Sequence, residues 1–331
     1  MARVRAKITE VAREAGVSLS TVSRVMNGNP TVDPALADRV RAVADRLGYI
    51  ADPLARSLVL GRTQTISVVV PDLANPTFHA VLRGVSRAAA RDGYHVLVSD
   101  TEEQVSQERE IAMATRRRTD GVILCAPRMS QDELSALLPS IAPAVVINRT
   151  ALTAAPTVAA DYGAATCALI AHLRDLGHRR LAYLSGAVDS ESGVARARAI
   201  DLSMAGDPAL EVLTIPAGVD FDSGAAAADA VLASGATGVL AFNDLVAMGL
   251  LSAMTERGIR VPGALSIAGF DDIPFAAYTT PPLTTAMVPT LRIGDSAWVA
   301  MRALLANAEP QMSEMFTPTL VVRESTGPVS P

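Results

Sequence analysis

Hydrogen-bonding side chains recur directly after short apolar, β-branched segments along this 331-residue chain. They are Asp72 and Asn75 after residues 66–70, Asn148 and Arg149 at the end of 145–148, Asn243 after 238–242, and Asp271 after 265–269. If these segments are parallel strands, their carboxyl ends meet at one sheet edge, where open α/β folds bind ligands. Such groups accept from and donate to adjacent hydroxyls, and Phe78 could stack on a ring. The pattern predicts a small-molecule pocket, although a turn cap explains Asn75 nearly as well.

The sequence lacks the motifs of catalysis and of metal binding. It has no Gly-x-Gly-x-x-Gly fingerprint after a strand, no Walker loop and no Gly-x-Ser-x-Gly elbow. Its two cysteines, Cys125 and Cys167, have no redox or metal spacing, and its four histidines form no HExxH pair. The adjacent carboxylates Asp271 and Asp272 do not by themselves make an acid–base pair. We therefore expect a protein that is not an enzyme, with no catalytic residue, no metal and no cofactor.

From Thr65 onward, β-branched runs alternate with segments rich in Ala, Leu and Arg. The predicted strands are 66–70, 95–99, 121–125, 145–148, 180–185, 238–242 and 265–269; the predicted helices are 76–92, 105–117, 132–139, 162–176, 194–205, 222–234, 243–257 and 290–306. This alternation is typical of parallel sheets with helices on both faces. The strands are too many for one ordinary sheet, so we predict an α/β core of two doubly wound parallel-sheet lobes.

The first 48 residues follow a different, all-α pattern. Thr9 can cap a short helix that runs through Ala15, and residues 19–26 form a second short amphipathic helix. Gly16 between them can adopt the backbone conformation of a tight turn. Asp33-Pro34 begins a third helix, and Gly48 ends it. Three short helices in this length predict a helix-turn-helix domain. Residues 49–62 connect it to the core through a helical segment too short to be stable alone.

Charge is unevenly distributed along the chain, whose net charge is −5. Residues 1–62 hold ten Lys and Arg against six Asp and Glu (+4), and residues 63–331 hold 19 against 28 (−9). A basic head on an acidic body indicates that the head meets phosphate and the body does not. No apolar run reaches about 18 residues and no signal-peptide pattern opens the chain, so we expect a cytoplasmic protein without membrane contact.

Motifs spread over nearly the whole chain resemble the lactose repressor–galactose repressor (LacI/GalR) family of bacterial regulators. They are VAREAGVS (11–18), TVSRVMNG (21–28), ARSL (55–58), TDGVIL (119–124), LGHRR (176–180), FND (242–244), LSIAGFDD (265–272) and TPPLTT (280–285). Each motif alone is weak, but the ordered set is specific. The resemblance implies a helix-turn-helix headpiece (1–48), a hinge helix (49–62) and an effector-binding and dimerisation core (63–331) similar to periplasmic sugar-binding proteins. Lobe one would take about 63–161 and 290–319, and lobe two about 162–289 and 320–331.

The resemblance also implies which side chains contact DNA. In the family's pattern, the two positions after the turn and the Arg four residues further on read bases; here they are Leu19, Ser20 and Arg24. Arg can donate two hydrogen bonds to guanine, whereas Leu can only touch a thymine methyl. Small polar groups suited to phosphate oxygens surround these three: Ser18, Thr21, Ser23 and Asn27. Plain helix surface is the alternative for Thr21 and Ser23, and a solvated charge is the alternative for Arg24.

In the hinge, the resemblance assigns Ala55 and Leu58 to the DNA contact. The family's hinge Leu enters the minor groove as a wedge and kinks the duplex. The alternative is that Leu54 and Leu58, four residues apart, form an ordinary apolar stripe. A hinge that orders only when paired with its twin implies a homodimer on a near-palindromic operator in double-stranded DNA.

For the core, the resemblance adds Asp161, Ser192, Arg196 and Phe221 to the effector contacts. Arg196 and Asp271 are the principal candidates, with a salt bridge as the alternative, and Gly206 predicts a short helix after Arg196. The predicted function is that of a transcriptional repressor whose operator affinity is controlled by a small molecule, a sugar or sugar derivative, bound between the lobes. A nucleoside- or purine-responsive regulator stays open. So does a secreted binding protein without a DNA role, which the headpiece and the missing signal peptide oppose.

Overall fold

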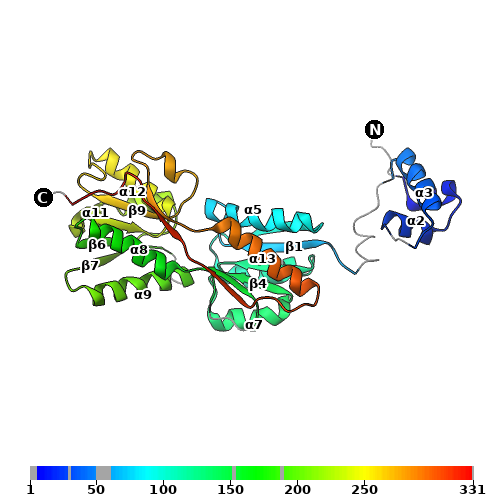
Figure 1. The fold of residues 1–331 in the computed structure, drawn as a ribbon, viewed down its shortest axis with the longest axis horizontal. Helices are drawn as coiled ribbons and strands as arrows, with labels where there is room; N and C mark the ends of the chain where they lie inside the picture. The colour runs from blue at the N-terminus through cyan, green and yellow to red at the C-terminus, as the bar shows by residue number, and fades with distance from the viewer. Residues whose placement is uncertain (1–5, 29–30, 50–60, 151–153, 187–189, 330–331) are drawn as a thin grey trace. The chain divides into compact units, whose positions relative to one another are not determined.

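A computed structural model describes residues 6–28, 31–49, 61–150, 154–186 and 190–329 of the chain (Figure 1). The chain divides into two compact units, with the boundary between Gln64 and Thr65. Each unit is described by itself below.

The first unit is a three-helix bundle. It contains α1 (Ile8–Ala15), α2 (Leu19–Met26) and α3 (Pro34–Leu47). Gly16 ends α1 in the left-handed conformation, at φ 65°, which is why a residue without Cβ suits the turn. One valine from each helix is completely buried where the three helices meet: Val11, Val22 and Val40. This small apolar core fixes which face of α2 stays outside.

The second unit begins with lobe one, which is built on a six-stranded parallel sheet. Its strands lie in the order β11 (Ser313–Phe316), β5 (Thr157–Ala160), β4 (Ala144–Ile147), β3 (Gly121–Cys125), β1 (Thr65–Val70) and β2 (His95–Asp100). Its helices are α5 (Pro76–Arg91), α6 (Val105–Arg116), α7 (Gln131–Ile141) and α13 (Thr290–Leu305). Helices α5 and α13 pack backbone to backbone at Gly84 and Gly294, where a Cβ would lie 2.3 Å from a carbonyl oxygen of the other helix.

Lobe two repeats the architecture with a second six-stranded sheet. Its strands lie in the order β12 (Thr319–Val321), β10 (Thr284–Met287), β9 (Ser266–Asp271), β8 (Gly238–Ala241), β6 (Arg180–Ser185) and β7 (Glu211–Pro216). Its helices are α8 (Tyr162–Asp175), α9 (Glu191–Gly206), α10 (Phe221–Ala226), α11 (Ala228–Ser234), α12 (Asp244–Glu256) and the 3-10 turn η1 (Ala276–Tyr278). The edge strand β12 runs antiparallel to β10. The two sheets confirm the predicted fold class.

The chain crosses between the lobes three times. It passes to lobe two after β5, returns with α13 after β10, and passes back between β11 and β12, the red segment of Figure 1. The returning helix α13 is anchored in lobe one by Trp298, which is buried and donates its indole N–H to Asp92 at 2.7 Å. The ring of Trp298 also packs on Tyr94, so its role is in the core.

The structure differs from the predicted elements in three ways. Strands β5, β7, β10, β11 and β12 were not predicted; they are short, and three of them are partly exposed edge strands with mixed polar residues. The predicted helix 222–234 is two helices, α10 and α11. Two helices begin earlier than predicted: α1 begins at Ile8 and not after a Thr9 cap, and α9 begins from a Ser190 cap and not at residue 194, whereas α9 ends at Gly206 as predicted.

No helix in the described ranges has the length and apolar character needed to cross a membrane.

Candidate effector pocket and DNA-binding face

Helix α2 presents the predicted DNA-reading residues on its outer face. Ser18 begins the helix by accepting a hydrogen bond from the Thr21 backbone N–H at 3.1 Å. Leu19, an apolar residue, is 48 % exposed, and Arg24 is exposed as well. Burial of Val22 on the opposite face orients these residues outward, so the first turn of α2 has the amphipathic arrangement of a recognition helix.

The remaining polar residues of this face hydrogen-bond to one another. Ser20 is exposed, and its hydroxyl lies 2.8 Å from that of Ser18. Asn27 ends the helix, and its amide donates to the Ser23 hydroxyl at 3.4 Å. The hinge residues Ala55 and Leu58 lie outside the described residues, so their assignment stays a prediction.

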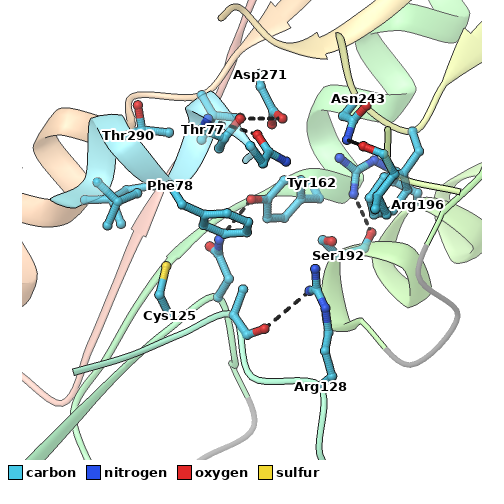
Figure 2. Close-up of a pocket in the computed structure, with 18 of the residues that line it drawn as sticks. Thr77, Phe78, Cys125, Arg128, Tyr162, Ser192, Arg196, Asn243, Asp271 and Thr290 are labelled. Atoms are coloured by element: carbon cyan, nitrogen blue, oxygen red, sulfur yellow. Dashed lines mark hydrogen bonds between the residues drawn. The ribbon is translucent and has the colours of Figure 1, made fainter. Parts of the chain in front are cut away.

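A pocket lies between the two lobes at the carboxyl ends of the strands (Figure 2). Seven of the eleven predicted effector residues line it: Asn75, Phe78, Asn148, Ser192, Arg196, Asn243 and Asp271. Arg149 is buried instead, and it donates to the Pro127 carbonyl at 3.5 Å and to the Gln131 side chain at 3.3 Å. The seven lining residues come from α5, the end of β4, α9, the start of α12 and the end of β9. Residues separated by almost 200 positions therefore face one space, because both sheets turn their carboxyl edges toward it.

Three other predicted residues lie elsewhere. The Asp72 carboxylate accepts from the Ala74 N–H at 2.7 Å, which closes a local turn. Asp161 caps α8 through the Ala164 N–H at 2.9 Å, and its neighbour Tyr162 lines the pocket instead.

Phe221 is 45 % exposed and lines a separate groove on lobe two. The reason is the close packing of α10 on α12: a Cβ on Gly249 would lie 1.9 Å from the Phe221 carbonyl oxygen. This contact fixes the start of α10 against α12 and leaves Val219 at the pocket.

Arg196 is the most enclosed charged group of the pocket. Its guanidinium carbon lies 4.6, 4.5 and 4.1 Å from the ring centroids of Tyr162, Phe242 and Phe270. These distances are within the range of cation–π attraction. Nη1 donates to the Ser192 carbonyl at 3.0 Å, and the buried Nε has no hydrogen-bond partner among the described residues. The aromatic rings hold the arginine in place while leaving donors free for a ligand.

Asp271 lies at the end of β9, next to Phe270, on whose ring Arg196 packs. It has φ 107°, which is unusual for a residue with a side chain. Burial raises the pKa of its carboxyl to about 6, against the lowering effects of Arg196 and of the hydrogen bond from Thr77. Neither Asp271 nor Arg196 takes part in an ion pair within the described part of the chain, so the salt-bridge alternative is not what the structure shows.

The asparagines of the pocket serve two purposes at once. Asn75 caps α5 through the Thr77 N–H at 3.0 Å, and Asn243 caps α12 through the Val246 N–H at 2.9 Å. In each case the side-chain oxygen makes the cap, and the amide nitrogen of Asn243 donates to the Val219 carbonyl at 2.8 Å. Asn75 therefore both caps α5 and lines the pocket.

Several pocket residues were missed by sequence reasoning. They are Thr77, Glu103, Cys125, Arg128, Tyr162, Phe242 and Thr290, with the apolar Val81, Ala126, Val219, Val288 and Ile293. Cys125, Arg128 and Phe242 end or follow predicted strands, so the rule that located Asn148 could have found them. Burial raises the pKa of the Cys125 thiol to about 12, which keeps it protonated. Within the described residues, no cluster of three or more His, Cys, Asp or Glu could hold a metal ion.

Comparisons with known proteins agree with this geometry. Residues 7–52 match the family described as bacterial regulatory proteins, lacI family, and residues 170–326 match a periplasmic binding protein-like domain. The chain is 31 % identical to catabolite control protein A of Priestia megaterium, covering 90 % of this chain and 91 % of that protein. The chain belongs to the lacI family of transcriptional regulators.

Other lacI-family proteins align over nearly their full length. Identity is 33 % to the transcriptional repressor PurR of Photobacterium profundum (97 % and 98 % covered) and 31 % to the regulator GalR of Escherichia coli (97 % and 95 %). A lac repressor dimer bound to operator has the same fold, with a TM-score of 0.88 at 24 % identity over 98 % of this chain and 99 % of that chain. This lacI-family chain is accordingly a DNA-binding transcriptional regulator, and its relatives are regulators rather than enzymes.

Proposed function

We propose that this regulator is a repressor that binds a near-palindromic operator as a homodimer, and that an uncharged sugar bound between its lobes controls operator affinity. The observation that carries the proposal is that Arg196 and Asp271, both from lobe two, line one interlobe pocket without forming an ion pair within the described residues. Arginine donors and a carboxylate acceptor that lie close together match the adjacent hydroxyls of a sugar.

The charges of the pocket favour an uncharged ligand. Arg196 faces Asp271, and Arg128 is paired with Glu103 at 2.8 Å. Because each cation has an acidic counterpart in the same pocket, a ligand with a net charge would lie close to a like charge whichever sign it carried. Phe78 and Phe242 add apolar surface of the kind that covers one face of a sugar ring.

Effector binding should be coupled to the separation of the lobes. The centre of a water-sized sphere can move through only about 40 Å³ of the pocket, so the lobes confine this space closely. Three hydrogen bonds join the lobes beside it: Thr77 to Asp271 at 2.8 Å, Asn148 to Tyr162 at 2.9 Å, and Thr150 to Glu191 at 3.0 Å. A sugar that enters must break or replace some of these hydrogen bonds, so it should bind one arrangement of the lobes more tightly than the other. Allosteric control requires such a difference in affinity between two states.

The relatives support a sugar as the ligand class. A regulator named CelR, solved as a cellobiose complex, is 26 % identical and has a TM-score of 0.68 over 97 % of this chain and 100 % of that chain. On the DNA side, the exposed Arg24 of α2 is suited to donate two hydrogen bonds to a guanine.

The test combines a ligand screen with DNA selection. Thermal unfolding of the full chain is measured with neutral sugars, sugar acids, nucleosides and purines, and operator sequences are selected from a random duplex library. We expect a neutral sugar to raise the unfolding temperature and to change affinity for a palindromic selected sequence. Stabilisation by a nucleoside or purine alone, or an operator bound identically with and without every ligand, would contradict the proposal.

A further inference from the structure

A second arginine, Arg128, reaches the pocket from lobe one, opposite the side that carries Arg196 (Figure 2). Its side chain is only 8 % exposed. Nε and Nη2 donate to the two oxygens of Glu103, each at 2.8 Å, and Nη1 donates to the Ala126 carbonyl at 3.3 Å. This bidentate pair joins the loop after β2 to the loop after β3.

The loop that carries Arg128 is held by another acidic residue. Glu108 of α6 is 4 % exposed, and its carboxylate accepts from the backbone N–H of Arg128 at 2.7 Å and of Met129 at 2.8 Å. Burial raises the pKa of Glu108, and the two backbone hydrogen bonds oppose that rise. The loop therefore has its own anchor, and the side-chain pair with Glu103 is not needed to keep it in place.

Glu108 positions the backbone of this loop, whereas the Glu103 carboxylate acts on the charge and the donors of Arg128. The carboxylate accepts the Nε–H and one N–H of Nη2, and the Ala126 carbonyl accepts one N–H of Nη1. Among the described residues, the second N–H of Nη2 and the second N–H of Nη1 stay available at the pocket. The Glu103 carboxylate also cancels the charge of Arg128 where the dielectric is low and an uncancelled charge would act strongly on a ligand. Arg128 is thereby suited to donate to a hydroxyl and unsuited to attract an anion.

We propose that Glu103, acting through Arg128, determines the charge selectivity of the effector site: the pair admits uncharged sugars and rejects the corresponding sugar acids and sugar phosphates. This inference rests on the proposed sugar-binding function. Glu103 is a positioning and charge-compensating residue, and Arg128 is the group that touches the ligand. Removal of the negative charge on Glu103 leaves a buried cation in the pocket, and an anionic ligand would then be its natural partner.

The experiment compares matched neutral and acidic ligands on one protein. The probes are D-glucose with D-glucuronate, D-galactose with D-galacturonate, and D-ribose with D-ribose 5-phosphate, titrated into full-length wild type and Glu103→Gln by calorimetry. For the pair whose neutral member binds the wild type, we expect Glu103→Gln to shift the ratio of acidic to neutral affinity at least tenfold toward the acid. The matched control is Glu102→Gln, since Glu102 is exposed and its adjacent position loses the same charge outside the pocket lining; its ratio should equal that of the wild type.

A further variant, Arg128→Met, guards against a folding defect in Glu103→Gln. It leaves the Glu103 carboxylate uncompensated, so we expect weaker binding of both members and the larger loss for the acid. The inference alone fails if the wild type prefers the acidic member, or if the ratio is unchanged in both variants while a neutral sugar still binds. If the wild type binds none of the six probes and responds only to nucleosides or purines, the proposed sugar-binding function fails and the inference falls with it.

Discussion

The DNA-reading face and the effector pocket are built by opposite routes. On α2, the residues predicted to contact DNA lie within ten positions of one another, and one cap and a few buried valines orient them. In the pocket, Arg196, Asp271 and Phe78 come from three elements and both lobes. The first site depends on local structure, and the second depends on where two sheets end.

This difference has a physical consequence for substitutions. The outer side chains of α2 are solvated, so their removal should change DNA recognition with little effect on folding. The polar groups of the pocket are buried and mutually dependent, so their removal should change stability and ligand binding together. The four predictions below test that contrast.

The largest effect is expected for Arg196→Met. The variant loses the donors that face the ligand and the cation held among three aromatic rings, so effector affinity should fall about 100-fold or more, roughly 3 kcal/mol. Operator affinity without effector should stay within about twofold of the wild type. Calorimetry with the sugar found in the screen and anisotropy with the selected operator measure the two quantities. Normal effector binding by the variant would remove Arg196 from the site.

Asp271→Asn should change the pH dependence of stability. The folded-state pKa of Asp271 is raised from 3.8 to about 6, so its protonated form is favoured by folding. The stabilising contribution is complete below about pH 4 and is lost as the pH rises through 6, a change of about 3 kcal/mol at most. The variant lacks this titration, and its amide oxygen can still accept from Thr77.

The measurement is urea unfolding of both proteins between pH 4.5 and 7.5. Stability of the variant relative to the wild type should rise with pH across this range. Asp244, whose pKa is raised by burial and by the nearby Asp271 carboxylate, should have a lower pKa in the variant, and this change acts in the same direction as the loss of the Asp271 titration. Parallel curves would show that Asp271 keeps its ordinary pKa.

Arg24→Ala should weaken and relax DNA recognition. Loss of a bidentate contact to guanine costs about 1–3 kcal/mol of discrimination at one base pair. We expect the variant to bind the selected operator more weakly and to tolerate substitutions at that position, with unchanged effector affinity. An anisotropy series over singly substituted operators gives the answer, and an unaltered base preference would refute the assignment.

The smallest effect is expected for Ser18→Ala. Its hydroxyl caps α2, and loss of such a cap costs about 1 kcal/mol. Hydrogen exchange of the α2 amides in the full chain should show that the free energy of local opening is lower by about 1 kcal/mol. Ser20→Ala is the control, because Ser20 is exposed and makes no cap; equal exchange in both variants would contradict the capping role.

The accuracy of sequence reasoning followed the same division between the two regions. The three headpiece helices and the outward face of α2 could be predicted because capping, apolar spacing and the turn at Gly16 act over a few residues. In the core, buried strands such as β1 and β3 were predicted, but β7, β11 and β12 were not, because they are edge strands that are partly exposed and carry mixed polar residues.

The effector residues show where this reasoning stops. A polar residue after a strand can face the pocket, as Asn148 does, or close a local turn, as Asp72 does. The sequence around each residue is similar, and only the direction of the following chain separates them. Phe221 shows the same limit, because the contact of α10 with Gly249 directs it to another groove.

The sequence by itself determined that this chain joins a helix-turn-helix domain to an α/β core with polar groups at its strand ends, since those features arise from local propensity and periodicity. Only the tertiary structure decided that Arg196 sits among three aromatic rings, that its charge acts on the Asp271 carboxyl, and that Glu103 pairs with Arg128. The reason is that burial and charge compensation depend on distances between segments that the chain brings together only when both lobes have folded.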